Sequence, residues 1–292
     1  MNYLNEIKGY LKIKISQLLM RYPTHHKPLK IQHPPKNKPK VLILGIYLEY
    51  RENTFNHLIN AFNESIACDV DQIWVSLNPK NSPKSNETEN KNYASHVLVK
   101  QLFELKPKFT ILNELLEEID ISKYDYIVFT DDDIFVDDNF LDAFIGWQQH
   151  LNFCLAQPAR TRTSTADNTF VVSRPWLNAR ETHFVEIGPL FSMDKSIVNE
   201  LLPFDLESPM GWGYDLVWPI KVIASGKTMG IIDATPVQHS MRPQGAAYST
   251  AKESILMNEY LSKKQHINFR EACTIVKNYS KISFLKKPFN LF

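Results

Sequence analysis

Segments with the apolar pattern of strands alternate with segments of helical period along most of this chain of 292 residues. The first is the run Val41–Leu48, which we interpret as a buried strand, and residues 54–66 follow it with the spacing of a helix. Strand-like runs at 72–77 and 124–130 and a helical segment at 138–151 continue the pattern. Such alternation is typical of an α/β fold with a mainly parallel central sheet flanked by helices.

The same two periods assign the remaining segments of the chain. The predicted helices occupy residues 93–105, 115–119, 215–226, 249–263 and 268–279. The predicted strands occupy residues 108–112, 183–188, 189–193 and 227–232, and a polar loop covers residues 78–92. We therefore expect one body over residues 41–247, a basic segment over residues 1–40 and a helical extension over residues 248–292.

Charge separates the first 40 residues from the rest of the chain. The formal net charge is +1, but residues 1–40 carry +8 and residues 41–292 carry −7. The near-zero total argues against a protein that binds nucleic acid with its whole surface. The three cysteines, Cys68, Cys154 and Cys273, lie too far apart for a zinc ribbon and do not suggest a disulfide framework. We expect a cytoplasmic protein, because a reducing compartment fits such cysteines.

The basic segment has two parts with different patterns. Residues 3–20 have the spacing of an amphipathic helix with lysines between the apolar positions, and residues 22–40 form a linker rich in proline. Such a helix can make peripheral contact with an anionic membrane, here the inner face of the cytoplasmic membrane, or dock on a partner. The alternative is packing on the body of the chain. No run of the sequence approaches the roughly 18 apolar residues of a membrane-spanning helix.

Three consecutive aspartates, Asp131, Asp132 and Asp133, follow directly on the predicted strand at 124–130. Adjacent carboxylates repel one another, and a divalent cation would offset that repulsion. In an extended chain residues two apart point the same way, so we expect Asp131 and Asp133 to face one site and Asp132 to point away. Oxygen ligands of this kind suit Mg²⁺ or Mn²⁺ that bridges phosphates. The alternative is an acidic loop that caps the next helix.

A turn of sequence Gly-Trp-Gly-Tyr-Asp at residues 211–215 precedes the predicted helix at 215–226. The indole of Trp212 offers a face for stacking on a sugar ring, and Asp215 lies at or near the start of the helix. Because a helix N-terminus stabilises the charged carboxylate, we expect a lowered pKa for Asp215, which could cap the helix, accept a proton from a bound hydroxyl, or both. His239 follows the strand at 227–232 and could complete a carboxylate-rich metal shell as a neutral imidazole.

Together these clusters resemble the GT-A fold glycosyltransferases over about residues 41–242. Those enzymes have an Asp-x-Asp at a strand end, an acceptor-side acid and, in many cases, a late histidine, which Asp131–Asp133, Asp215 and His239 match in order. Residues 183–242 also resemble an uncharacterised GT-A-like family of plants and bacteria, through the motifs Phe184-Val185-Glu186, Pro189-Leu190-Phe191-Ser192, Gly211-Trp212-Gly213-Tyr214-Asp215 and Gly230-Ile231-Ile232-Asp233. In β-galactosyl-type transferases a further acid often follows the first, where this chain has Leu216.

The resemblance implies a metal-dependent hexosyltransferase-like enzyme that moves a sugar from a nucleotide-sugar to a glycan or glycolipid in cell-surface polysaccharide synthesis, by inversion with Asp215 as base. It implies a single Rossmann-like domain, with a nucleotide-binding half at 41–137 and an acceptor half at 138–247. Mn²⁺ or Mg²⁺ would be held by Asp131, Asp133 and His239. The nucleotide would contact Asp131, Asp132, Tyr47 and Arg51. The substrate-binding residues would be Trp212, Gly213, Tyr214, Glu186, Arg160 and Arg162, the two arginines following a turn at Gln157-Pro158.

Three other functions remain as alternatives. A nucleotidyltransferase would need a glycine-rich basic phosphate loop near the first strand, where this chain has only Gly45 and Arg51. A haloacid-dehalogenase-type phosphatase would need threonine or valine where Phe135 stands. A non-catalytic glycan-binding or scaffold protein with the same fold would bind carbohydrate without metal or nucleotide.

Overall fold

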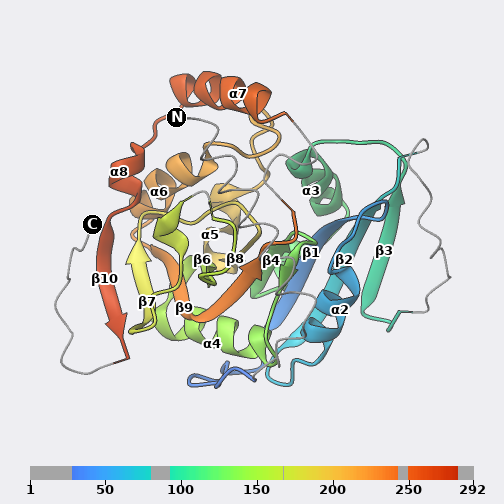
Figure 1. Cartoon of the computed structure of the whole chain (residues 1–292), viewed down its shortest axis with the longest axis vertical. Helices are drawn as coiled ribbons and strands as arrows, with labels where there is room; N and C mark the ends of the chain where they lie inside the picture. Colours follow the sequence, from blue (N-terminus) through green and yellow to red (C-terminus); the bar gives the residue numbers. More distant parts are fainter. Residues whose placement is uncertain (1–27, 80–92, 167, 243–248, 282–292) are drawn as a thin grey trace.

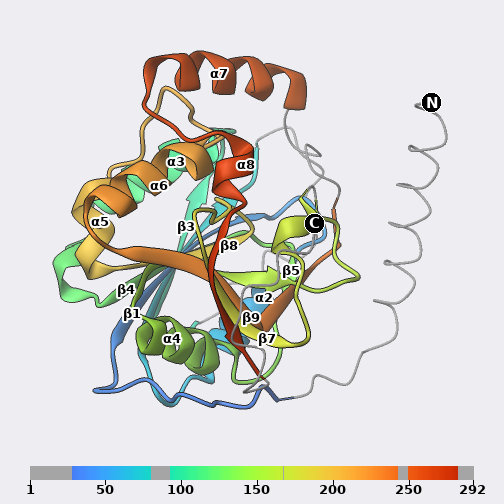
Figure 2. The same ribbon diagram turned by 90° about the vertical axis from the view of Figure 1, so that its left-hand side faces the viewer.

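A large β-sheet lies between two layers of helices in the computed structural model (Figures 1 and 2). Helices α2 (Phe55–Asn63) and α4 (Phe140–Leu151) cover one face of the sheet. Helices α3 (Lys108–Glu117), α5 (Lys195–Leu201) and α6 (Tyr214–Ala224) cover the other face. The structure describes residues 28–79, 93–166, 168–242 and 249–281. The predicted α/β class with flanking helices is confirmed.

The strands follow an order that mixes neighbouring and distant parts of the chain. From one edge to the other it is β10 (Ile275–Ser280), β7 (Leu177–Thr182), β9 (Thr228–His239), β6 (Phe153–Arg160), β8 (Leu190–Asp194), β4 (Tyr126–Thr130), β1 (Lys40–Leu48), β2 (Asp69–Leu77) and β3 (Val97–Leu102). Strands β7 and β8 pair antiparallel with both of their neighbours, and the other neighbouring pairs in this order are parallel. All strands of this order except β7 and β8 therefore run in the same direction, and in this sense the sheet is mainly parallel. The short strand β5 (Ile134–Phe135) pairs with the end of β9.

Alternate side chains of β1 enter two separate hydrophobic cores. Val41 and Ile43 pack in the core that includes α2 and α4, whereas Leu42 and Leu44 pack in the core that includes α3, α5 and α6. All four side chains are fully buried. A strand that is covered on both faces reads as a continuous apolar run, which is why the sequence identifies this strand clearly.

The topology brings five strand ends to one edge of the sheet. Strands β1, β4, β6 and β9 run in the same direction and finish there at Leu48, Thr130, Arg160 and His239. Strand β8 runs the opposite way, so it begins at this edge with Leu190, which pairs with Thr130. Ligands of open α/β sheets bind beyond the carboxyl ends of the parallel strands. The loops at this edge are therefore the place to look for a site.

Two segments before Asp131 have the opposite secondary structure to the one that we predicted. Residues 93–105 contain strand β3 instead of a helix, and residues 108–112 begin helix α3 instead of forming a strand. Strand β3 is an edge strand in which buried Val97 is followed by exposed Leu98, so the period of two was missed. In α3 the buried side chains of Phe109, Ile111, Leu112 and Leu115 share the face toward the sheet, and Pro107 stands at the cap position.

Three further predictions in the second half are wrong. Gln157 and Pro158 lie inside strand β6, where we had predicted a turn, and residues 183–188 form no strand. Residues 268–279 form a short helix, α8 (Phe269–Ala272), and then strand β10, which joins the main sheet. The predicted helix at 249–263 is confirmed as α7 (Thr250–Lys263). Two 3₁₀ turns, Ile121–Lys123 and Thr169–Val171, complete the elements.

The described part of the basic segment, residues 28–40, contacts helix α4 before it enters β1. The ring of His33 stacks on His150 at 3.6 Å and meets the edge of Trp147 at 4.3 Å. The predicted amphipathic helix at 3–20 lies outside the described residues. In the part of the chain that the structure describes, no helix has the length and apolar character needed to span a membrane. Cys68, Cys154 and Cys273 are free thiols, the first two buried.

Candidate active site

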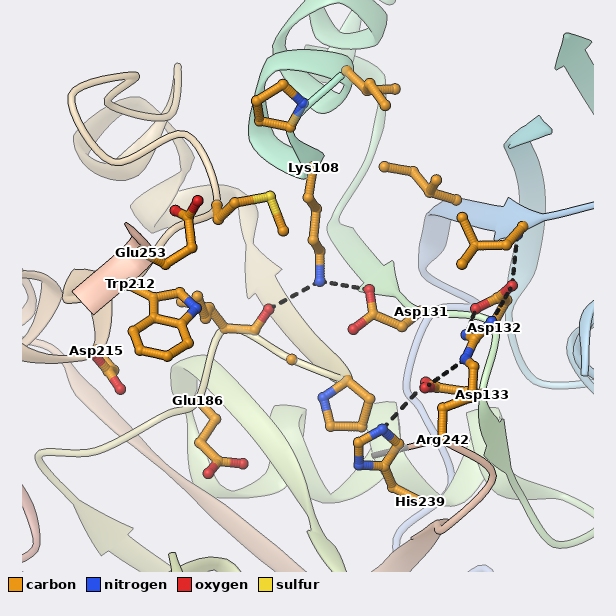
Figure 3. A pocket seen from close by; sticks show the side chains of 18 of the residues that line it. Lys108, Asp131, Asp132, Asp133, Glu186, Trp212, Asp215, His239, Arg242 and Glu253 are labelled. Carbon is orange, nitrogen blue, oxygen red and sulfur yellow. Dashed lines mark hydrogen bonds and ion pairs between the residues drawn. The ribbon is translucent and has the colours of Figure 1, made fainter. Parts of the chain in front are cut away.

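A pocket of about 860 Å³ opens at the edge of the sheet where the strand ends meet (Figure 3). One wall, which we call the donor wall, carries Asp131, Asp132, Asp133, His239 and Arg242. The facing wall, which we call the acceptor wall, carries Glu186, Trp212, Asp215 and Glu253. The loop after β4, the end of β9, the segment before β8, the turn before α6 and helix α7 supply these residues, so distant parts of the sequence form one site.

The three aspartates do not alternate as we had predicted. The chain bends at Asp132 and Asp133 before β5 begins, so the alternation of an extended strand does not apply there. Asp131 turns toward helix α3, where Lys108 Nζ lies 2.6 Å from its Oδ1 atom and also donates to Ile187 O at 3.2 Å. Asp132 and Asp133 instead share the guanidinium of Arg242 (Figure 3).

Burial acts differently on the two aspartates that Arg242 joins. Asp132 is almost fully buried and accepts from Leu48 N at 2.7 Å, and burial raises its pKa to about 6 although Arg242 acts in the opposite direction. Burial also opposes ionisation of Asp133, but the adjacent His239 and the guanidinium of Arg242 lower its pKa to about 2. Asp133 is therefore held as a carboxylate inside the pocket.

The pairing of two strands places His239 beside Asp133. Ile134 of β5 lies opposite His239 of β9, which brings His239 Nε2 to 3.3 Å from Asp133 Oδ1. On the other side of the ring, Arg160 Nη1 lies 2.6 Å from Nδ1. A guanidinium can only donate, so Nδ1 accepts and the neutral ring carries its proton on Nε2. Arg160 thereby orients the histidine toward the aspartate.

A divalent metal ion at this place would bind Asp133 and His239, and Nε2 of the ring would first have to lose the proton that the Arg160 contact assigns to it. Asp133 Oδ1 is buried, and among the described residues its contact is the long one of 3.3 Å with His239 Nε2, so an oxygen is left for a cation. A carboxylate and an imidazole suit Mn²⁺. The predicted third ligand, Asp131, faces Lys108 instead, and no group of three or more candidate side chains for a metal occurs in the described ranges. The remaining ligands would then come from a diphosphate.

The acceptor wall is built around the start of helix α6. Gly213 precedes the helix with φ of 95°, in the left-handed region that favours glycine, and Asp215 lies in the first turn. Burial, and then the negative charge of Glu186, raise the pKa of Asp215 to about 7 although backbone N–H groups act in the opposite direction. The predicted lowering of this pKa is wrong because desolvation outweighs the helix N-terminus.

The structure brings most of the predicted site residues together. Arg51, Arg160, Glu186, Trp212 and Gly213 line the pocket with the aspartates and His239. Glu186 pairs with Arg160 at 2.6 Å, so Arg160 contacts both walls.

Three predicted residues lie elsewhere. Tyr47 is buried in the core, where its ring stacks on Phe55 at 3.9 Å, and Tyr214 is buried with its hydroxyl donating to Asp205 O. Arg162 is exposed and does not line the pocket. Tyr47 and Tyr214 carry large aromatic rings that belong to the two hydrophobic cores, and burial of such rings stabilises the fold strongly.

The pocket residues that sequence reasoning missed include Lys108, Glu253 and Arg242. Lys108 lies in a segment that we had predicted to be a strand, and Glu253 lies in the predicted C-terminal helical extension, outside the expected body of the chain. Arg242 lies three residues after His239, and only this proximity in the sequence could have indicated it.

Comparisons with known proteins support the fold. No protein-family model matches the sequence, and no curated protein matches it. A crystal structure of GalNAc-T7 with UDP, GalNAc and Mn²⁺ matches with a TM-score of 0.52 and 11% identity, over 77% of this chain and 48% of that chain. This chain thus spans about half the length of that protein.

Two further structures match at a TM-score of 0.47. One is Staphylococcus aureus TarS 1–349 with UDP-GlcNAc, at 10% identity over 76% of this chain and 71% of that chain. The other is the Pyrobaculum calidifontis mannosyltransferase PcManGT with GDP-Man and Mn²⁺, at 13% identity over 91% of this chain and 75% of that chain. On the GalNAc-T7 match and the sheet topology, the chain has the fold of the GT-A glycosyltransferases.

Proposed function

We propose that this protein is a metal-dependent glycosyltransferase that moves a sugar from a nucleotide-sugar to a glycan or glycolipid acceptor. The observation that carries the proposal is the buried Asp133–His239 pair, which faces Asp215 across one pocket (Figure 3). A metal–diphosphate complex would bind at the first group, and a base would act from the second. We assign the acceptor to the glycans assembled into cell-surface polysaccharides.

On the donor wall, Asp133 and His239 would hold Mn²⁺ or Mg²⁺. The ion would neutralise the diphosphate as it leaves. Lys108, Arg51 and Arg242 add positive charge at the same place, and Lys108 holds Asp131 at 2.6 Å. Asp131 and Asp132 would contact the nucleotide.

On the acceptor wall, Trp212 would stack on the acceptor sugar and Asp215 would take the proton from its hydroxyl. A pKa of about 7 makes Asp215 a stronger base than an ordinary aspartate while leaving much of it ionised near neutral pH. If the hydroxyl attacks the anomeric carbon from the side opposite the leaving diphosphate, the displacement inverts that carbon. Glu186, paired with Arg160, raises the pKa of Asp215 through its charge.

A thermal-shift series with UDP, GDP, ADP, CDP and dTDP, each with and without Mn²⁺, tests the donor site. We expect one or two nucleotides to raise the melting temperature, and to raise it more when Mn²⁺ is present, because the ion would join the diphosphate to Asp133 and His239. An absence of any metal-dependent shift would contradict the proposal. Retained binding of carbohydrates in that case would favour a glycan-binding protein.

A further inference from the structure

One buried carboxylate of the pocket has no part in the proposed reaction. Glu253, in the first turn of helix α7, lines the pocket and exposes only 5% of its surface. Its Oε2 atom is buried and has no hydrogen-bond partner within the described part of the chain. Figure 3 places it on the same wall as Trp212 and Asp215. A buried charged oxygen without a donor destabilises the fold, so this position is suboptimal for stability alone.

The rest of helix α7 fixes the position of Glu253. Met257 and Leu261, four and eight residues further on, lie on the same face of the helix, and a Cβ atom built on Gly213 would lie 3.2 Å from either side chain. Tyr260 packs its ring against Tyr214 at 5.7 Å. The next turn ends in an ion pair of 2.6 Å between Lys264 and Asp205. The helix is thus held against the Gly-Trp-Gly turn, and its first turn faces the pocket.

Two carboxylates of the acceptor wall lack a cationic partner among the described residues. Arg160 pairs with Glu186 at 2.6 Å, whereas neither Asp215 nor Glu253 forms an ion pair with any residue in the described ranges. Lys252 also borders the pocket, but its residue is exposed. A ligand that donates hydrogen bonds would complete this wall.

We propose that Glu253 binds the acceptor by accepting a hydrogen bond from a hydroxyl or ammonium group of the sugar that lies against Trp212. Glu253 would then determine which acceptors enter, while Asp215 takes the proton in the reaction. The inference rests on the proposed function, because it needs an acceptor sugar at this wall. It adds to that function a residue from the C-terminal helix, outside the segment 41–242 that carries the family resemblance.

The test compares Glu253→Ala and Glu253→Gln with Glu259→Gln, an exposed glutamate on the same helix. Binding of the methyl glycosides of glucose, galactose, mannose, N-acetylglucosamine and glucosamine to the full chain is measured by saturation-transfer NMR. Nucleoside diphosphate affinity in Mn²⁺ is measured alongside. We expect Glu253→Ala to weaken glycoside binding about tenfold, as for a hydrogen bond to a charged group, and to leave nucleotide affinity within about twofold. Glu259→Gln should change neither.

The Glu253→Gln variant distinguishes a hydroxyl donor on the sugar from an ammonium donor. A hydroxyl can still donate to the amide oxygen, so neutral glycosides should lose only about threefold in Glu253→Gln. An ammonium group loses its counter-charge, so glucosamine binding should fall more and become insensitive to salt. Both variants should melt at the same temperature as the wild type or higher, since each removes an unpartnered buried charge.

The outcomes also separate this inference from the proposed function. Unchanged glycoside affinity in Glu253→Ala, with nucleotide binding intact, would overturn the role of Glu253 alone. So would a wild type that binds none of the glycosides. A wild type that binds no nucleotide in the presence of Mn²⁺ would overturn the glycosyltransferase itself. A lower melting temperature in both variants, with parallel losses of nucleotide and glycoside binding, would make Glu253 a structural residue.

Discussion

Both walls of the pocket carry aspartates, but the charges that surround these aspartates are of opposite sign on the two walls. On the donor wall every aspartate has a cationic partner, with Lys108 at Asp131 and Arg242 at Asp132 and Asp133. On the acceptor wall Asp215 has no such partner in the part of the chain that the structure describes, and it lies near the negative charge of Glu186. In the proposed reaction the first group would hold metal and phosphate, and Asp215, whose pKa is raised by burial and by the charge of Glu186, would act as a base. The comparison indicates that burial and neighbouring charges distinguish carboxyl groups of the same residue type.

The largest effect is expected at Asp133. Asp133→Asn keeps the size of the side chain but removes the charge that a metal needs, so sugar transfer should fall by about a thousandfold or more. The Mn²⁺-dependent thermal shift with a nucleoside diphosphate should disappear with it. Asp138→Asn, an exposed residue of the same loop, serves as the control and should behave as the wild type. Normal sugar transfer by Asp133→Asn would show that the donor wall takes no part in the reaction.

The next effect is expected at Asp215. Asp215→Asn should lower the turnover number by about a hundredfold to a thousandfold, as loss of a general base does, and leave nucleotide affinity unchanged. In the wild type the rate should rise with pH up to about 7, because the protonated carboxyl cannot act as a base. Equal losses of turnover and nucleotide affinity would instead place Asp215 on the donor wall. Asp69→Asn, exposed at the start of β2, is the matched control.

Asp215 should also make the free energy of unfolding depend on pH. Folded Asp215 keeps its proton up to about pH 7, whereas an unfolded aspartate loses it near 3.8, so the free energy of unfolding should decrease as pH rises between these values. Asp215→Asn should remove this decrease and be more stable than the wild type at pH 8, by about 1–3 kcal/mol. Urea denaturation at pH 5 and pH 8 measures the difference. Equal stabilities of variant and wild type at both values would contradict the raised pKa.

A smaller effect is expected at Trp212. Trp212→Ala should raise the KM for the acceptor about tenfold, because stacking of a sugar on an aromatic ring contributes on the order of 1 kcal/mol. The KM for the donor should not change. Trp176→Ala removes a half-exposed tryptophan away from the pocket and is the control. An increase confined to the donor KM would show that the two walls are assigned the wrong way round.

The smallest effect is expected at Lys108. Lys108→Met removes the cation beside Asp131, so donor affinity should fall by only a few-fold, in line with one partly exposed ion pair. Acceptor KM should stay constant. Lys123→Met, at an exposed position, is the control. A loss as large as that of Asp133→Asn would mean that Asp131 also holds the metal, contrary to its orientation in the structure.

Sequence reasoning succeeded where a local pattern had one physical interpretation. Val41–Leu48 reads as a strand because both of its faces are buried. Asp133, Asp215 and His239 could be selected because each follows or begins an element at the same edge of a parallel sheet. Sequence reasoning failed at β3 and α3, because their short apolar runs are compatible with the period of a strand and with that of a helix. Only the elements that pack against them show which faces are buried.

By itself, then, the sequence determined the α/β class, the edge of the sheet that holds the site and most of the residues at that edge. Only the tertiary structure decided which aspartate meets which cation, because those partners lie far apart in the chain, as Arg242 does from Asp132 and Lys108 from Asp131. It also decided that the pKa of Asp215 rises, since desolvation depends on the elements that pack around a residue and not on its place in a helix. Glu253 joins the pocket for the same reason: helix α7 folds back over a turn 40 residues earlier.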